Sequence, residues 1–191
     1  MKLSIFPNKE GSYIIEFALI RKAQKGDVAA LEKLIEQHYD NIFSYLYRKT
    51  GNTDIAEDLT QEVFLRLVNT LSRYRPTGKI SNYIFTIAVN TANDYFRKNR
   101  LFVQEDVNSL IIDAGVDIED FFIRQEQFSR LKEAIRELPD KQKDAILLRY
   151  FHDMKIKDIS KITGANTSTV KSRISQGLKK LKILLSEVEP D

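Results

Sequence analysis

Cysteine is absent from this chain of 191 residues, which excludes a disulfide framework, a thiolate zinc site and a cysteine nucleophile. Glycine and proline are scarce, at seven and four residues, and this scarcity favours helices over a turn-rich β-fold. No stretch approaches the roughly 18–20 consecutive apolar residues that cross a bilayer, and residues 1–11 lack the apolar segment of a signal peptide. We therefore expect a cytoplasmic protein without a membrane span.

Charge is unevenly distributed, although the formal net charge is only +3. Residues 105–120 carry six acidic side chains and no lysine or arginine. Between Asn166 and Glu187 the order reverses, with five basic side chains and no acidic one. A basic end beyond an acidic middle is typical of a modular chain that faces a polyanion.

Helical periodicity divides the first half of the chain into four segments behind a loose leader, residues 1–12. The segments begin near Tyr13, after Asp27, at Asp54 and after the breaker at 75–78, and the last runs to a basic tail at 97–100. The third shows the clearest pattern, because its apolar positions recur at four-residue steps: Ile55, Leu59, Val63, Leu67 and Leu71. These segments predict a first domain over residues 13–100.

The second half begins with residues 101–120, which have no clean period and are interpreted as an acidic linker. A helix is expected from Phe121 to Pro139, another over 140–151, and two short helices follow. The sequence thus predicts an all-α protein of two small helical domains joined by a linker. The second domain, residues 121–191, contains a helix-turn-helix.

The helix-turn-helix rests on a short isoleucine-rich helix, a turn at Gly164 and a second helix with Asn166 as its N-cap. The second helix is predicted to bury four apolar residues: Val170, Ile174, Leu178 and Leu181. Two short helices joined by a tight glycine-containing turn are the geometry that presents one helix to the major groove of DNA.

The opposite face of that second helix carries the candidate DNA contacts. Side chains that reach base edges or open the first helical turn are Thr167, Ser168, Thr169, Lys171, Ser172, Ser175 and Gln176. Arg173 and Lys179 flank them, as expected of phosphate contacts. The alternative is an amphipathic surface helix with ordinary polar decoration.

Three motifs occur in a defined order. They are AEDLTQEVFLRL at 56–67, IAVNTANDYFR at 87–97, and Leu138-Pro139 followed by TVKSRI at 169–174. Together they resemble a bacterial sigma factor of the compact extracytoplasmic-function group of the sigma-70 family, which keeps only the region-two and region-four domains. The resemblance implies a subunit that binds core RNA polymerase, recognises the −35 and −10 promoter elements and aids promoter melting for transcription initiation.

The resemblance also implies where the polymerase binds. The positions that match the contact with a coiled coil of its largest subunit are Asp58, Gln61, Glu62 and Phe64. The polar members lie beside the four-residue apolar stripe, so a polar surface borders a buried one and could dock a partner helix. The alternative is a solvated helix face with i,i+4 pairs such as Glu62–Arg66.

The fourth segment resembles the element that captures the −10 sequence. Positions that match the pocket for an extruded base are Tyr74, Phe85, Asn90 and Asp94, and Tyr83 stands where the family usually has Trp. Arg97, Lys98 and Arg100 would hold the DNA backbone. Phe85 and Tyr74 could instead be core residues.

Two further interpretations remain open. A transcriptional regulator would use residues 13–100 for sensing or dimerisation, although the 58–62 motif argues against it. An enzyme is disfavoured, because His38 and His152 lie in different expected domains and the Asp58–Glu62 pair lacks further ligands. We expect no catalysis, no metal and no cofactor. The resemblance implies one more partner, an anti-sigma protein.

Overall fold

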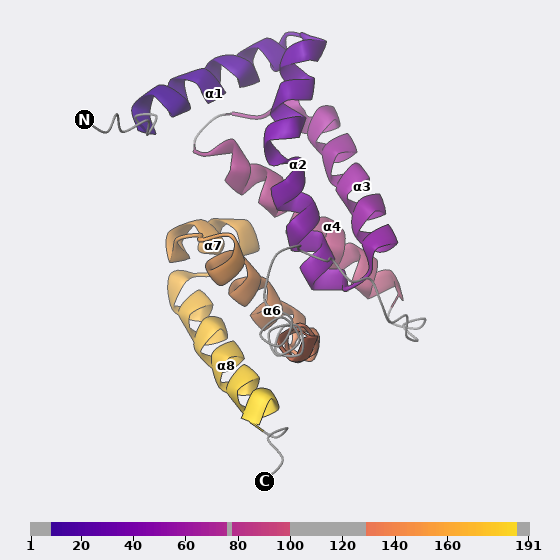
Figure 1. Cartoon of the computed structure of the whole chain (residues 1–191). Helices are drawn as coiled ribbons and strands as arrows, with labels where there is room; N and C mark the ends of the chain where they lie inside the picture. Colours follow the sequence, from indigo (N-terminus) through magenta and orange to yellow (C-terminus); the bar gives the residue numbers. More distant parts are fainter. Residues whose placement is uncertain (1–8, 76–77, 100–128, 187–191) are drawn as a thin grey trace, which may run out of the picture.

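The computed structural model describes residues 9–75, 78–99 and 129–186, and all regular structure within these ranges is helical. The helices form two groups that lie side by side (Figure 1). Helices α1 to α4 make the N-terminal domain, and the helices after residue 128 make the C-terminal domain. The predicted fold class, two helical domains with a helix-turn-helix in the second, is confirmed. The acidic linker at 101–120 and the residues 121–128 of the next predicted helix lie outside the described ranges.

The N-terminal domain consists of α1 (Lys9–Gln24), α2 (Val28–Thr50), α3 (Thr53–Leu71) and α4 (Ile80–Asn99). Short polar side chains start two of them: Asp27 Oδ1 accepts from the Ala30 amide, and Asn52 Oδ1 accepts from the Ile55 amide, both at 3.0 Å. Gly51 ends α2 with φ 72°, the left-handed geometry that favours glycine.

The core of this domain follows the predicted stripes closely. Four of the five apolar residues that recur along α3 are buried, and they meet buried residues of α2 and α4, including Leu34, Ile42, Leu46, Ile84 and Ala88. Each helix contributes one apolar face, so burial is shared among three packed helices.

The C-terminal domain contains a helix over 129–136, α6 (Asp140–Ile146), a π-helical turn η1 (Leu147–Phe151), α7 (Ile156–Thr163) and α8 (Thr167–Ser186). The single helix predicted over 140–151 is therefore α-helical only to Ile146 before it widens. Gly164 ends α7 with φ 64°, and Asn166 Oδ1 accepts from the Thr169 amide at 2.7 Å at the start of α8, as predicted.

Two predicted details are wrong. Helix α1 begins at Lys9, so residues 9–12 of the expected leader are helical; Lys and Glu at the first two positions are good helix formers and offset Gly11. In α8 the third buried position is Gly177 and not Leu178, which is 42% exposed. A Cβ on Gly177 would lie 3.0 Å from Ile146 Cγ1, because α8 packs closely on α6 at this point.

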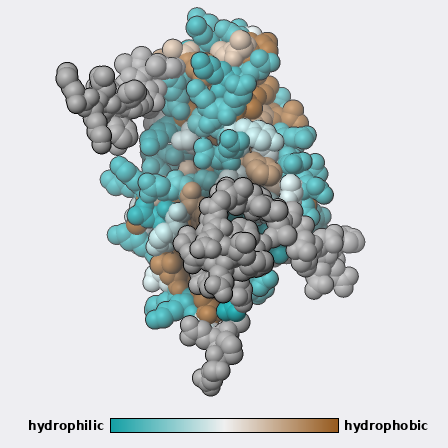
Figure 2. Space-filling model, viewed as in Figure 1, coloured by the Kyte–Doolittle hydropathy of each residue, from teal (hydrophilic) through white to brown (hydrophobic). Residues whose placement is uncertain are grey.

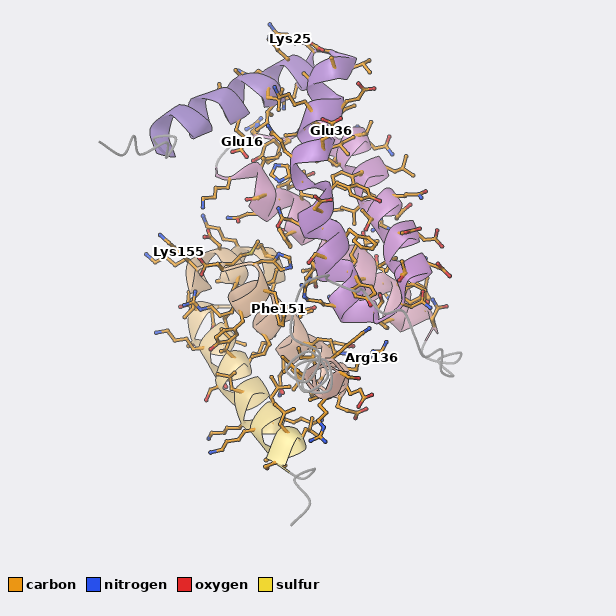
Figure 3. All side chains as sticks on the ribbon, viewed as in Figure 1. Glu16, Lys25, Glu36, Arg136, Phe151 and Lys155 are labelled. Atoms are coloured by element: carbon orange, nitrogen blue, oxygen red, sulfur yellow. The ribbon has the colours of Figure 1, made fainter. Side chains whose placement is uncertain are left out.

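The two domains touch through α4 against α7 and through α2 against η1. Figure 3 places Phe151 between the domains and Arg136 beside the lower end of α2. The face visible in Figure 2 is mainly hydrophilic with small hydrophobic patches. Within the described ranges, no helix has the length and apolar content needed to span a bilayer.

Candidate nucleic-acid interface

The outer face of α8 holds the predicted DNA contacts together. Seven of the nine predicted side chains are exposed, and Thr169 and Arg173 are half-buried. The helix can present this face because Val170, Ile174, Gly177 and Leu181 anchor the opposite one. Hydroxyl, amide and cationic groups therefore project from one side of a helix that follows a tight turn, as major-groove recognition requires.

The side chain of Gln176 forms two hydrogen bonds with other side chains of the protein at this face. Its Nε2 donates to Ser172 Oγ at 3.2 Å, and its Oε1 accepts from Gln142 Nε2 at 3.3 Å. Both bonds are long and lie at the surface, so a base edge can replace them at little cost. Gln142, on α6, is a neighbour of the recognition face that sequence reasoning missed.

The exposed face of α3 combines acids with apolar side chains. Asp58 and Gln61 are exposed, and Glu62 Oε1 accepts from Arg66 Nε at 2.6 Å, the predicted i,i+4 pair. Sequence reasoning missed Leu65 and Val68, which are 59% and 43% exposed and continue the same side of the helix. Both residues could have been identified from the sequence, since they are apolar and lie outside the four-residue stripe that fills the core.

The position of Phe64 differs from the prediction that its side chain contacts the polymerase. Its side chain is only 6% exposed and its ring stacks on Tyr39 at 5.9 Å between centroids. Helical spacing explains the burial, because Phe64 lies one turn after buried Thr60 and one turn before buried Leu67 on α3. Phe64 therefore supports the α3 face from below, and Tyr39, which is 38% exposed, is the aromatic ring at the surface.

An open pocket of about 250 Å³ lies between α3 and α4. It brings together two predicted −10 residues, Tyr83 and Asn90, with residues that sequence reasoning missed: Arg66, Asn69, Thr70 and Ile87. Tyr74 packs against Tyr83 with ring centroids 4.7 Å apart, and its hydroxyl donates to Gly78 O at 3.3 Å. An aromatic ring, an amide and a cation thus line one small hollow.

The remaining predicted −10 residues lie apart from this pocket. Asp94 pairs with Arg97 at 2.9 Å and with Arg66 at 3.7 Å, so its charge is already balanced. Lys98 is exposed, and Arg100 lies outside the described residues. Phe85 is 4% exposed and contacts the rings of Tyr45 and His152, so in this conformation it is a core residue and not a base platform.

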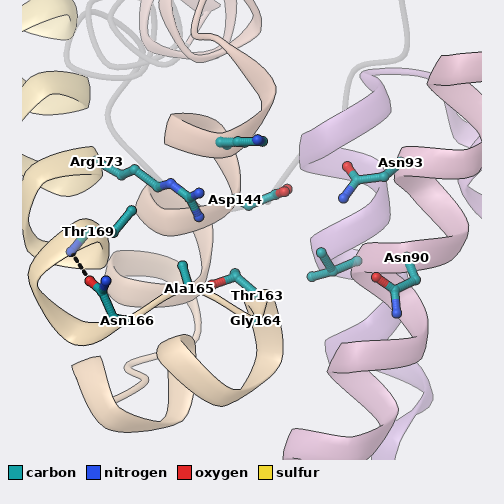
Figure 4. Close-up of a pocket in the computed structure, with 11 residues that line it drawn as sticks. Asn90, Asn93, Asp144, Thr163, Gly164, Ala165, Asn166, Thr169 and Arg173 are labelled. Carbon is teal, nitrogen blue, oxygen red and sulfur yellow. Dashed lines mark hydrogen bonds between the residues drawn. The ribbon is translucent and has the colours of Figure 1, made fainter.

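A larger cavity of about 450 Å³ lies between the middle of α4, helix α6 and the turn that joins α7 to α8. Figure 4 shows Asn90 and Asn93 on one wall and Arg173, Asn166 and Thr169 on the other. One predicted −10 residue, Asn90, therefore lies across this cavity from two predicted −35 residues, Thr169 and Arg173. Among the described residues, no three His, Asp or Glu side chains are grouped as metal ligands.

Buried polar residues at the foot of the cavity were not predicted. Lys49 and Asp144 are 1% and 3% exposed, and their Nζ and Oδ1 atoms are 2.6 Å apart. Tyr45 donates its hydroxyl to the same Oδ1 at 2.7 Å. Burial, reinforced by the Asp144 charge, raises the pKa of Tyr45 well above its usual value.

Comparison with known proteins identifies the two domains. Residues 34–102 match the family described as Sigma-70 region 2, and residues 128–181 match Sigma-70, region 4. RNA polymerase sigma factor SigV of Bacillus subtilis is 31% identical over 167 residues, which cover 87% of this chain and 97% of that protein. ECF RNA polymerase sigma factor SigW of the same organism is 29% identical over 179 residues, covering 88% and 96%.

Solved structures share the fold. CnrH, in complex with the cytosolic domain of CnrY, superposes with a TM-score of 0.69 at 18% identity, over 90% of this chain and 97% of that one. The sigma factor RpoE of Bartonella quintana, in complex with the anti-sigma factor NepR, gives 0.67 at 20% identity over 83% and 98%.

The chain belongs to the sigma-70 family of RNA polymerase sigma factors, within the extracytoplasmic-function group. Members of this family are not catalytic enzymes. The chain binds core RNA polymerase and directs it to promoters, with recognition of the −35 and −10 elements.

Proposed function

We propose that three surfaces of the chain divide the work of promoter recognition. The outer face of α8 reads the −35 element, the exposed face of α3 binds the polymerase, and the pocket between α3 and α4 receives a base of the −10 element. The observation that carries this assignment is that each surface gathers accessible side chains of the appropriate chemistry, on one helix face for α3 and α8 and from two helices for the pocket.

At the −35 element, Lys171 and Gln176 read base edges, since Lys suits guanine and Gln suits adenine. Thr167, Ser168, Ser172 and Ser175 contribute further polar contacts, and Arg173 and Lys179 bind phosphates that set the register. The Asn166 cap uses the Thr169 amide, and the other first-turn amides at the start of α8 remain suited to a phosphate.

At the polymerase, the α3 face offers Asp58 and Gln61 as a polar rim beside exposed Leu65 and Val68. An apolar centre with a charged rim is the usual anatomy of a protein interface. The buried Phe64 fixes the position of Tyr39 at its edge. We place the contact with the polymerase coiled coil on these residues.

At the −10 element, Tyr83 supplies a stacking surface and Asn90 a hydrogen-bonding amide in the α3–α4 pocket. Unpairing a base costs a few kcal/mol, and stacking on an aromatic ring returns about 1–3 kcal/mol. Arg97, Lys98 and Arg100 contact the DNA backbone. Asp94 acts through Arg66 and Arg97, which it holds in place.

The proposed roles extend to the compartment in which the chain acts and to a further protein partner. We propose that the chain acts in the cytoplasm, performs no catalysis and uses no cofactor. CnrH and RpoE of Bartonella quintana were solved with CnrY and NepR bound. We propose an anti-sigma partner for this chain as well, one that covers the α3 face or the α8 face.

Two pairs of substitutions test the division of work. Lys171→Ala with Gln176→Ala should lower transcription from the cognate promoter at least tenfold while core polymerase binding persists. Asp58→Ala with Gln61→Ala should weaken polymerase binding. All four side chains are exposed. Within the part of the chain that the structure describes, Lys171, Asp58 and Gln61 make no side-chain hydrogen bond, and Gln176 makes only its two surface bonds, so the fold should be unaffected.

The matched controls are Lys182→Ala on α8 and Glu133→Ala on the 129–136 helix, which are exposed and lie outside the proposed surfaces. Thermal unfolding of each variant should match the wild-type protein. Loss of both activities in both pairs, with intact folding, would refute the assignment of roles.

A further inference from the structure

Helix α3 ends without the local features that end other helices of the chain. Helices α2 and α7 each stop at a glycine in the left-handed region, whereas Ser72, the residue after α3, is right-handed with φ −59° and ψ −30°. The last turn of α3 also carries no basic side chain. The last carbonyl groups of a helix have no partner within it, so those of α3 need partners from the residues that follow or from another element.

A side chain of α1 binds the carbonyl groups at this end. Gln24, the last residue of α1, donates through Nε2 to Leu71 O at 2.9 Å and to Tyr74 O at 2.7 Å. Both bonds are half-buried and join residues 47 and 50 positions apart. The backbone turns in the same place, because the Tyr74 amide donates to Leu71 O at 3.0 Å. Gln24 therefore acts as a cap for α3 that comes from a different helix.

The position of Gln24 is fixed by the corner between α1 and α2. Ile20 and Ala23 are buried, so the last turns of α1 lie against the helices of this domain. The Gly26 amide donates to Ala23 O at 3.0 Å, and Gly26 has φ 89°, which lets the chain turn sharply into α2. This corner lies at the same end of the domain as the end of α3 and the start of α4 (Figure 1).

The second carbonyl that Gln24 binds belongs to an aromatic residue beside the proposed −10 pocket. The Tyr74 ring packs against Tyr83, which lines that pocket. Tyr74 is thus held by α1 at its carbonyl group, by α4 at its ring and by Gly78 O at its hydroxyl. A ring that has little freedom to lose binds a base more tightly, so a fixed Tyr74 makes Tyr83 a better stacking surface.

The other end of the connection from α3 to α4 also lies near α1. Burial raises the pKa of Glu16, in the middle of α1, and the positive charge of Lys79 opposes that rise. Lys79 is the residue before α4 begins. Because charges act on each other only over a short range in salt solution, Lys79 lies close to α1. Helix α1 therefore borders the connection where it leaves α3 and where it enters α4.

We propose that Gln24 is a positioning residue for −10 recognition: it holds the connection after α3 so that Tyr74 keeps Tyr83 in the orientation that stacks on an extruded base. Gln24 acts through these two residues and does not touch the DNA. Helix α1 then contributes to base capture as well as to the stability of the domain. The inference rests on the proposed function of the pocket between α3 and α4.

The first test observes the ring at position 83 directly in the free chain. The chain contains no tryptophan, so Tyr83→Trp introduces a single tryptophan at the stacking position. In this background, Gln24→Met keeps the length of the side chain but removes its donors, and should at least double the quenching of the tryptophan by acrylamide. Gln24→Lys brings an ammonium donor to the same carbonyl groups and should restore most of the protection.

The matched control for both tests is Ala18→Met. It adds the same side chain at an exposed position of α1 without a change of charge, and should leave the quenching unchanged.

The second test measures base capture by the holoenzyme, with Tyr83 in place. The probe is a duplex promoter fragment that core polymerase transcribes with this chain, with 2-aminopurine replacing one −10 adenine of the non-template strand at a time. This base becomes fluorescent when it leaves the DNA stack. Gln24→Met should slow the fluorescence rise at least fivefold, and Gln24→Lys should recover most of the rate. Binding to core polymerase and to a −35 duplex should match that of Ala18→Met.

Unchanged tryptophan quenching in Gln24→Met would overturn the inference. Equal losses of −10 opening, −35 binding and core polymerase binding, with a lower unfolding temperature, would overturn it too, because Gln24 would then only stabilise the domain. If the wild-type holoenzyme gives no fluorescence rise at any −10 position, the proposed function of the pocket fails and the inference fails with it. A wild-type rise that Gln24→Met does not slow refutes the inference alone.

Discussion

At the scale of single residues, His152 is a titratable group that packs against aromatic rings of the other domain. Burial, together with the nearby Arg48 charge, lowers its pKa to about 4, and its Nε2 has no hydrogen-bond partner. The neutral imidazole is therefore the form that fits between Phe85 and Tyr45. A side chain that must stay neutral to remain in place makes the contact between the two domains sensitive to acid.

The sign of this pH dependence follows from linkage. A base whose pKa is depressed by burial between the domains stabilises their contact fully above its free value of about 6.5 and loses that contribution as the pH falls towards 4. The maximum loss is roughly 3 kcal/mol, at about 1.4 kcal/mol per pKa unit. His152→Phe keeps an aromatic ring and should remove this part of the dependence.

Energy transfer between dyes on Glu36→Cys and Lys161→Cys measures the separation of the domains from pH 7.5 to 4.5. Both positions are exposed. Wild type should open more with falling pH than the His152→Phe variant. Parallel curves for the two proteins would rule out His152 as the titrating group.

Gly177 gives a second prediction at this scale. A Cβ there would meet Ile146, so Gly177→Leu should lower the free energy of unfolding of the protein by about 1–3 kcal/mol through overpacking. Lys182→Leu, on the exposed side of the same helix, should change it by less than about 0.5 kcal/mol. Chemical denaturation measures both, and equal effects would contradict the close approach of α8 to α6.

The surroundings of some residues could be predicted from the sequence and those of others could not. The exposure of the polar face of α8 was predictable, because an exposed polar face is the complement of a buried apolar one. Lys49 could not be predicted as buried, since a lysine before a helix-ending glycine normally interacts with the helix dipole in solvent. Its partner Asp144 is 95 residues away, which no local pattern reveals.

At the scale of elements, the caps of the helices are the most predictable features. Asp27, Gly51, Gly164 and Asn166 all hold the positions expected from their chemistry. The π-helical end of α6 carries no comparable signal, because its residues suit an α-helix equally well. The four-residue stripe of α3 predicted its core but hid the exposed apolar face beside it.

The role of Asn166 as the cap of α8 can be tested separately from its effect on promoter binding. Asn166→Ala loses the bond to the Thr169 amide and should cost about 1 kcal/mol of stability. Asn166→Asp keeps a capping oxygen and should keep that stability, yet its negative charge should weaken promoter binding. Thermal unfolding and promoter binding of the two variants measure these effects, and similar stability losses in both would contradict the capping role.

The exposed apolar side of α3 gives the other prediction at this scale. Leu65→Asp should weaken core polymerase binding at least tenfold with little change in thermal stability, because Leu65 is 59% exposed. Val28→Asp makes the same change at a site 65% exposed on α2, outside the proposed face, and should leave binding intact. Co-elution with core polymerase measures both, and unimpaired binding by Leu65→Asp would remove α3 from the interface.

At the scale of the whole molecule, the sequence predicted two helical domains and their order but nothing about how they pack together. Each domain has its own apolar stripes, whereas the contact between them is made of scattered polar and aromatic side chains such as Tyr45, Asn82 and His152. Such contacts have no periodicity. The contact with His152 also explains why Phe85 was assigned to a surface although it is buried, whereas Phe64 is buried against Tyr39 within its own domain.

The most direct measurement is transcription in vitro with core polymerase, this chain and a library of promoter fragments, with the RNA start sites sequenced. Starts should cluster downstream of shared −35 and −10 sequences and should depend on the added chain, and Lys171→Ala with Gln176→Ala should lower or redirect them. Unselective starts, or identical start sites with and without the chain, would contradict the account.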